Sequence, residues 1–309
     1  MIINPYMVTS PPNPLTIAYD ADNIQISGIS GDVPDDWNLE FAEDIHYVTI
    51  GTSTEVIGQS SFNGEATLSG ELNIPSSVNN IKSFAFRNAR FTGIVMEEGV
   101  TGIGNDAFRR TSSSVNNLKN LVIPNSVKQL GTNAFNLVDA PGNGLDLETF
   151  QLGTGITGFG GYSFYRSFWG GWTGELDLSS AVDIGDYAFA YWGRVTGLTL
   201  SNNLKTLGNN AFAGVTNLKN VVIPSSVTGI GSQLFNQGLG TTQDPGGDHG
   251  PATIEINVDT GVWVGADNFN NTNSGIYTIT GAYFQDYTGS SWSVDQGVAA
   301  GSIFISGTY

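Results

Sequence analysis

The sequence predicts a β-rich solenoid of about nine repeats, in which each turn of the coil stacks on the previous one. Three observations support this fold class. One motif recurs along the chain. It begins with an apolar residue, which is usually followed by Gly, and it has a Phe five positions after the apolar residue. An extended segment with apolar residues at alternate positions precedes each copy. Nearly all length variation falls between one Phe and the next extended segment, as expected when a coil keeps its register and insertions leave from one edge.

Nine phenylalanines mark the repeats. Eight of the nine apolar residues that precede them by five positions are followed by Gly, and the exception is Lys82. Because each Phe occupies the same place in its turn, we expect the rings to stack as a ladder in the core. The phenylalanines are Phe62, Phe86, Phe108, Phe135, Phe164, Phe189, Phe212, Phe235 and Phe269.

Each repeat is expected to open with a strand, as at residues 118–123 and 218–223. Pro75, Pro124 and Pro224 end such strands at a position where no ladder N–H is needed. A second short extended segment, a Gly turn and one helical turn that holds the Phe then complete the coil.

The best-formed repeat is LKNVVIPSSVTGIGSQLF, Leu218 to Phe235. This motif resembles the BspA-type leucine-rich repeats of bacterial, protist and viral surface proteins, and the likeness covers roughly residues 45 to 270. The segment IQISGISGDVPDDW, which begins at Ile24, is similar to the leader that often precedes them. The resemblance implies a curved leucine-rich-repeat coil, α/β by class at most, with a parallel sheet on one face. It also implies surface display and ligand or cell binding. The position three after each Phe, often Cys in the family, is never Cys here.

The chain divides into four predicted parts: a Pro-rich arm (1–14), an N-terminal cap (15–44), the repeat solenoid (45–273) and a C-terminal cap (274–309). A solenoid needs caps because its terminal strands have unpaired edges. At the N-terminal end we expect a β-hairpin of residues 17–19 and 24–26, with Trp37, Leu39 and Phe41 closing the first coil. At the other end we expect strands at 276–279, 282–284 and 303–305, with Trp292 and Val294 in the last core layer.

The arm has the composition of a polyproline-like segment and no pattern for packing onto the coil. Two interpretations stay open: it lies along the cap, or it is an attachment element. In the second interpretation the anchoring residues are Pro5, Tyr6, Pro11, Pro12 and Pro14.

Composition excludes several functions. The chain has 11 Lys+Arg against 28 Asp+Glu, a net charge of −17, so binding to nucleic acid or to an anionic membrane surface is disfavoured. It has no Cys, which removes disulfides and thiolate chemistry. The sequence contains no run of 18 apolar residues, so it predicts no membrane-spanning helix. The N-terminus does not have the pattern of a secretory signal peptide.

Nothing in the sequence predicts catalysis, a cofactor or a metal site. The two histidines, His46 and His249, are far apart, and the glycine-rich segment around His249 fixes no catalytic geometry. Two histidines without Cys do not make a zinc site. The acidic residues of the N-terminal cap do not match the EF-hand pattern, and we interpret them as turn residues, with calcium binding left open. These are Asp20, Asp22, Asp32, Asp35 and Asp36.

The strongest candidate site is a group of aromatic residues in the two repeats that contain Phe164 and Phe189. Phe164 and Phe189 belong to the ladder, and Trp192 is expected in the core. The remaining candidates for exposure are Tyr162, Tyr165, Phe168, Trp169 and Tyr191. Grouped exposed aromatics are typical of sugar platforms and protein interfaces. The alternative is a local core beneath an insertion.

The sequence therefore predicts a non-enzymatic binding or structural protein displayed on a surface. The first hypothesis is a virion component, a bacteriophage decoration, spike or tail-associated protein that mediates attachment or protein–protein contact. It rests on the missing signal peptide, the absence of Cys, the low Lys content and the Pro-rich arm. The alternative is a secreted or cell-surface bacterial adhesin that binds host protein or glycan. In both cases the expected partners are proteins, with a glycan as a second candidate.

Overall fold

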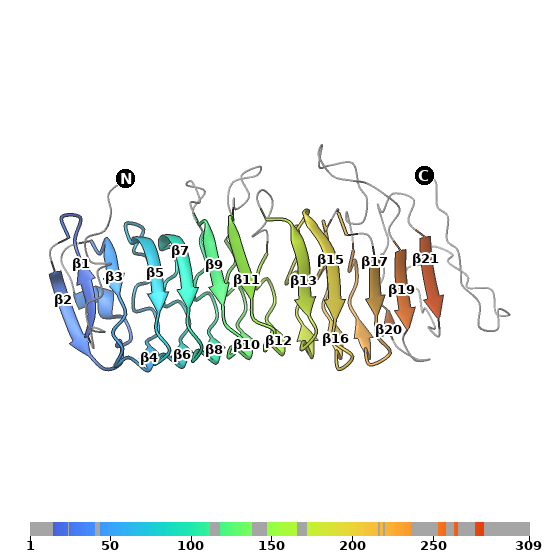
Figure 1. Ribbon diagram of the computed structural model, residues 1–309, viewed down its shortest axis with the longest axis horizontal. Helices are drawn as coiled ribbons and strands as arrows, with labels where there is room; N and C mark the ends of the chain where they lie inside the picture. Colours follow the sequence, from blue (N-terminus) through green and yellow to red (C-terminus); the bar gives the residue numbers. More distant parts are fainter. Residues whose placement is uncertain are drawn as a thin grey trace.

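The computed structural model is a coil whose turns lie side by side along its long axis (Figure 1). Its N-terminal strands lie at one end of this row and its last strands at the other. The structure describes residues 15–23, 25–40, 44–111, 118–137, 147–165, 172–215, 217–218, 220–235, 253–257, 263–264 and 276–280.

A narrow parallel sheet of nine strands runs without interruption along one side of the coil. Each turn contributes one strand of two residues, and every strand pairs in parallel with those of the neighbouring turns. The strands are β4 (Val56–Ile57), β6 (Asn80–Ile81), β8 (Gly102–Ile103), β10 (Gln129–Leu130), β12 (Gly158–Phe159), β14 (Asp183–Ile184), β16 (Thr206–Leu207), β18 (Gly229–Ile230) and β20 (Trp263–Val264).

The longer strands form a second parallel face, which is divided into three ladders. The first contains β5 (Ser69–Ile74), β7 (Arg90–Met96), β9 (Asn120–Ile123) and β11 (Thr149–Leu152). The second contains β13 (Gly174–Leu178) and β15 (Val195–Leu200). The third contains β17 (Asn220–Ile223), β19 (Thr253–Asn257) and β21 (Ile276–Thr280). Pro75, Pro124 and Pro224 directly follow β5, β9 and β17, as predicted.

Aromatic side chains pack where the first ladder ends. Phe150 of β11 meets Trp172 at a ring-centroid distance of 5.2 Å and Trp192 at 5.6 Å, both edge to face. Trp192 is fully buried, as expected, and its Nε1 donates a hydrogen bond to the Phe164 carbonyl oxygen at 2.8 Å. Side-chain packing therefore connects the turns at the break between β11 and β13.

The core contains the predicted Phe ladder. The eight described members, Phe62 to Phe235, are all buried, with exposures of 0 to 3%. Neighbouring rings stack with centroid distances of 5.0 to 6.0 Å and interplanar angles of 4 to 18°. Phe269 lies outside the described residues.

The Gly of the repeat motif is required by close contact between turns. A Cβ built on Gly208 would lie 2.4 Å from the Asp186 backbone nitrogen, and one on Gly231 would lie 2.4 Å from that of Asn209. Both distances are far inside van der Waals contact with a backbone that cannot move aside, so only Gly fits.

The turn that carries each Phe is not the predicted helical turn. It is a hydrogen-bonded turn whose first residue has a left-handed backbone, and the N–H groups of that residue and of the Phe donate to carbonyl oxygens of the next coil. The Phe135 N–H, for example, donates to the Ser163 carbonyl oxygen at 2.7 Å. In the described chain the only helical element is a 3₁₀ turn, η1 (Trp37–Glu40).

The N-terminal cap contains the expected hairpin, formed by β1 (Leu15–Tyr19) and β2 (Gln25–Ser30). Strand β1 also pairs antiparallel with β3 (Tyr47–Thr49), which joins the cap to the first repeat. Trp37 is fully buried and lies edge-on to Phe62 at 5.6 Å. The prediction for Leu39 was wrong: its exposure is 76%, because only one side of the short η1 turn faces the core.

Several predicted features lie outside the described residues. They are the arm with Pro5, Tyr6, Pro11, Pro12 and Pro14, the cap residue Phe41, the aromatics Phe168 and Trp169, His249, the strands at 282–284 and 303–305, and Trp292 with Val294. Strand β21 includes the predicted strand at 276–279.

Candidate functional site: a tyrosine cluster on the turn ridge

The Phe-bearing turns stack into what we call the turn ridge, defined by the residues two before and one after each ladder Phe. The residue two before the Phe has a φ of 54 to 62° in all eight described turns. This left-handed conformation costs free energy for any residue with a side chain, and Asn and Asp tolerate it best. The column contains Ser60, Phe84, Asp106, Asn133, Tyr162, Tyr187, Asn210 and Gln233.

Each turn brings the two ridge positions together. The N–H of the residue after the Phe donates to the carbonyl oxygen three residues earlier, at 3.0 to 3.2 Å in seven turns. The paired side chains then interact in a different way in successive turns. Arg87 lies over the Phe84 ring at 5.6 Å, Arg109 and Asp106 form an ion pair at 2.8 Å, and Asn136 donates to Asn133 at 2.7 Å. In the next turn Tyr162 and Tyr165 meet edge to face at 5.2 Å. The ridge is thus a regular scaffold with variable chemistry.

Four tyrosines gather where two of these turns adjoin, and we call Tyr162, Tyr165, Tyr187 and Tyr191 the tyrosine cluster. The first three occupy ridge positions, and Tyr191 is one residue beyond the ridge position of its turn. The Tyr162 and Tyr187 rings stack at 4.8 Å with an interplanar angle of 12°. Tyr165 stands edge-on to Tyr187 at 5.9 Å and to Tyr191 at 5.6 Å. All four side chains are half-buried. The cluster therefore presents aromatic surface and phenol groups at the boundary between core and solvent.

The fold holds this cluster in a defined position. The Tyr162 N–H donates to the Asp186 carbonyl oxygen at 2.7 Å, and the Tyr187 N–H donates to that of Asn209 at 2.8 Å. Tyr191 lies against Gly214, where a Cβ would come within 2.7 Å of the ring. Gly214 also has a φ of 72°, so both its conformation and the ring beside it require Gly.

The electrostatic environment of the cluster is negative. Burial raises the pKa of the Tyr162 hydroxyl, and the neighbouring Tyr187 and Asp186 raise this pKa further. Asp186 is exposed, and its Oδ1 accepts a hydrogen bond from the Asn209 N–H at 2.7 Å. The Tyr162 hydroxyl therefore stays neutral at physiological pH, close to the exposed Asp186 carboxylate.

The repeats match a known family model. A BspA-type leucine-rich repeat region, in six copies, matches residues 40–169 and 182–242, which is more than half of the chain. The chain belongs to the BspA-type leucine-rich repeat family. No curated protein matches this BspA-type sequence.

Solved structures of leucine-rich repeat proteins are similar to this BspA-type chain at low sequence identity. One from Bacteroides ovatus is 19% identical, with a TM-score of 0.41, and the match covers 78% of this chain and 72% of that one. A leucine-rich cell surface protein from Faecalibacterium prausnitzii is 14% identical, with a TM-score of 0.35 and coverages of 90% and 95%. The pneumococcal vaccine antigen PcpA is 16% identical, with a TM-score of 0.31 and coverages of 76% and 78%.

The structure places the sequence-predicted aromatics in two groups. Tyr162, Tyr165 and Tyr191 come together in the tyrosine cluster, whereas Phe168 and Trp169 lie outside the described residues. Sequence reasoning missed Tyr187 as a site residue. Its signal was available, because Tyr187 stands two residues before Phe189, just as Tyr162 stands two residues before Phe164.

The acidic N-terminal cap uses its carboxylates to bind backbone groups of the next coil. Asp32 Oδ1 accepts from the Glu55 and Val56 N–H groups at 3.0 and 2.8 Å. A hydrogen bond from the Gln59 N–H, together with Lys82, lowers the pKa of Asp35. Among the described residues, no three His, Asp or Glu side chains are grouped to bind a metal ion. The same residues contain no helix long and apolar enough to cross a bilayer.

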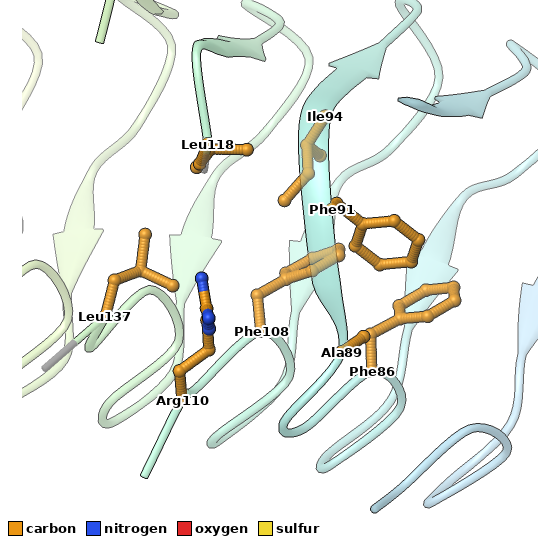
Figure 2. A pocket seen from close by; sticks show the side chains of 8 residues that line it. All are labelled: Phe86, Ala89, Phe91, Ile94, Phe108, Arg110, Leu118 and Leu137. Carbon is orange, nitrogen blue, oxygen red and sulfur yellow. The ribbon is translucent and has the colours of Figure 1, made fainter. Parts of the chain in front are cut away.

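A small hollow beside the second and third ladder turns is the other feature that could suggest a site (Figure 2). Ladder rings Phe86 and Phe108 line it together with Phe91 and Leu118, and Arg110 stands at its border beside Leu137. Arg110 is only 4% exposed. We assign this hollow to core packing, since its walls are ladder and strand residues.

Proposed function

We propose that this protein is a non-enzymatic binding protein displayed on a bacterial cell surface, where it attaches to host protein or glycan. The tyrosine cluster is its contact site. Family membership supports the surface role, because the BspA-type resemblance implies display and ligand or cell binding. The single observation that carries the contact site is that four half-buried tyrosines from two adjacent turns meet on the turn ridge.

Two arguments favour a contact site over a local core. First, the Phe ladder already fills the interior of these turns, with Phe164 and Phe189 both fully buried. Second, Tyr162 and Tyr187 occupy left-handed positions at which Asn would be less strained. Residues whose backbone conformation is strained are common at functional sites, and Tyr in the left-handed region is such a residue. Tyr is also among the residues that contribute most to binding at protein interfaces.

The virion hypothesis remains the second candidate, and it depends on the arm. Its composition-based support, low Lys and no Cys, fits a cell-surface protein equally well. In both settings we propose that residues 1–14 are an anchoring element, because their prolines stiffen the segment and lower the entropy lost on docking.

A cell-binding experiment tests the proposed function. The fluorescently labelled chain is applied to intact host epithelial cells, and a Tyr162→Asn/Tyr187→Asn double variant is compared with it. Asn suits the left-handed turns, so the variant is expected to fold. A loss of affinity of about tenfold or more is expected, which corresponds to about 1.4 kcal/mol.

The matched control is Tyr47→Asn, which removes a tyrosine of 41% exposure from strand β3, outside the cluster. It should bind cells as the unmodified chain does. Equal binding by the double variant and the unmodified chain, or no saturable binding by either, would contradict the proposal.

A further inference from the structure

We infer that two neighbouring turns of the ridge carry a second contact site, formed by Arg87 and Arg109, which binds an acidic segment of a protein partner. This site lies outside the tyrosine cluster, and its test does not depend on the tyrosines. The inference rests on how the two guanidinium groups are held, on the donors they leave unpaired and on the distribution of charge along the chain.

The two arginines occupy the same ridge position in neighbouring turns. Each stands one residue after its ladder Phe, and the N–H of each donates to the carbonyl oxygen three residues earlier at 3.2 Å. The Asn88 N–H donates to the Arg109 carbonyl oxygen at 2.8 Å, so the turns are hydrogen-bonded to each other beside the arginines. Because hydrogen-bonded neighbours in a sheet lie about 4.8 Å apart, this stacking places the two ridge positions next to each other.

Each guanidinium is held by the side chain three residues earlier. The Arg87 guanidinium carbon lies 5.6 Å from the centroid of the Phe84 ring, and Arg109 Nη1 donates to Asp106 Oδ1 at 2.8 Å. Phe84 does this with a φ of 62°, which is unfavourable for a bulky residue. Side chains that are fixed before binding lose less entropy when a partner arrives. The ridge therefore presents two guanidinium groups in defined positions.

The chain uses only part of the hydrogen-bonding capacity of these groups. The Nε atoms of Arg87 and Arg109 are buried, and neither donates to any group in the described part of the chain. Asp106 is the only carboxylate of the described residues that pairs with either guanidinium. A guanidinium has five N–H donors and suits a carboxylate in a two-pronged contact. Both arginine side chains are partly exposed, so outer donors remain for a partner's carboxylates.

The charge of this part of the chain favours an anionic partner. Residues 72–138 contain seven of the 11 Lys and Arg residues and three of the 28 Asp and Glu residues, which gives a net charge of +4. The next charged residues on the two sides, Glu71 and Asp139, are both acidic, so the sequence itself bounds this stretch. Its residues outside the described ranges are all uncharged. A basic stretch in a chain of net charge −17 attracts a negative group locally.

The rest of the chain favours a short acidic segment over a long polyanion. Outside residues 72–138 the chain has four basic and 25 acidic residues, so neighbouring turns would repel a long sulfated polysaccharide. Arg is also among the residues that contribute most to binding at protein interfaces. Two Glu or Asp side chains at alternate positions of an extended segment lie on one side, about 7 Å apart. Such a pair can reach both guanidinium groups.

Short acidic peptides test this inference. The probe is a fluorescently labelled peptide with Glu at three alternate positions in a Gly/Ser context, titrated with the full chain and followed by fluorescence anisotropy. In the control peptide Gln replaces each Glu, which keeps the side-chain length and removes the charge. We expect saturable binding of the Glu peptide, at least about tenfold tighter than that of the Gln peptide, and weaker at about 0.5 M salt.

Three variants separate the site from the general charge of the stretch. Arg87→Gln leaves no carboxylate of the described residues without its partner, so the fold should be kept, and we expect at least about fivefold weaker binding. Lys128→Gln is the matched control, because it removes the same charge from an exposed residue directly before β10, beside the narrow sheet, and it should leave binding unchanged. Phe84→Asn suits the left-handed turn and keeps every positive charge. We expect it to keep its melting temperature and to bind the Glu peptide more weakly, because the ring positions Arg87.

The outcomes that would overturn the inference are distinct from those of the cell-binding assay. Equal binding of the Glu and Gln peptides, or no saturable binding of either, would show that acidic groups are not recognised. Unchanged binding by Arg87→Gln would place the peptide elsewhere, and unchanged binding by Phe84→Asn would refute the positioning role of the ring. Saturation by a sulfated disaccharide, where the Glu peptide does not bind, would identify an anionic glycan as the partner. The cell-binding role of the tyrosines would stand in each case, since its variants lie in other turns.

Discussion

Removing one ring from the middle of the Phe ladder tests the core of this coil. Phe135 is fully buried and stacks on Phe108 at 5.0 Å and on Phe164 at 5.3 Å, with interplanar angles of 5 and 7°. A buried Phe→Ala substitution costs about 3–5 kcal/mol, and each lost ring pair contributes about 0.5–1.5 kcal/mol beyond area burial. With two partners lost, we expect Phe135→Ala to lower the free energy of unfolding by about 4–5 kcal/mol.

The measurement is urea-induced unfolding followed by tryptophan fluorescence and by far-UV circular dichroism. Trp192, one of six tryptophans, is buried against Phe164, the next ladder ring, so part of the fluorescence signal comes from this region. Agreement of the two probes would justify a two-state treatment, which long repeat arrays do not always obey. Val222→Ala, at a side chain of 50% exposure, is the matched control and should change stability by less than about 0.5 kcal/mol. A loss below about 1 kcal/mol for Phe135→Ala would refute the ladder as the source of stability.

Three further predictions concern the ridge, the coil edge and the arm. Gln233→Asn should raise the free energy of unfolding by up to about 1 kcal/mol in the same urea assay, because φ is 58° and Asn tolerates this region better; a lower stability would contradict the strain argument. Burial acts to raise the pKa of Glu98, but hydrogen bonds from the Ser126 and Asn125 N–H groups outweigh it and lower this pKa below its ordinary value. The ionised Glu98 carboxylate thus stabilises the fold at pH values above its unfolded-state pKa. This stabilisation is lost as the pH falls through the folded-state pKa. Glu98→Gln should therefore flatten the acid side of a plot of melting temperature against pH. Deleting residues 1–14 should leave the melting temperature unchanged while abolishing attachment to the native surface; a large drop would identify the arm as part of the cap.

The repeat architecture could be predicted because its signals are periodic and redundant. The spacing of Phe135 and its equivalents indicated the stacked core, and the Gly at positions such as 208 marked close contact between turns. The left-handed turns could not be predicted in this way, since the usual signal is Gly and this chain places Tyr, Phe and Gln there. The expected helical turn was wrong for that reason.

The candidate site was only partly predictable, for a related reason. The sequence indicated Tyr162, Tyr165 and Tyr191 because none of them occupies a ladder position or a strand of the repeat. Tyr187 is identified by its position in the turn. Contact between Tyr162 and Tyr187 depends on the stacking of two turns 25 residues apart, which only the register of the narrow sheet determines. The exposure of Leu39 likewise depends on which side of a short turn faces the coil.

The break between β11 and β13 has a mechanical consequence for the coil. Hydrogen-bond ladders resist shear and rotation because their geometry is directional, whereas edge-to-face aromatic contacts such as Phe150 with Trp172 tolerate small changes of angle. If the coil bends, the uninterrupted narrow sheet would keep its strand pairing and act as a hinge. The strands of the divided face would move apart at a break. Bending under load would then concentrate at the two breaks between the ladders, one between β11 and β13 and the other between β15 and β17. The residues of the tyrosine cluster lie in the stretch of chain between β11 and β15.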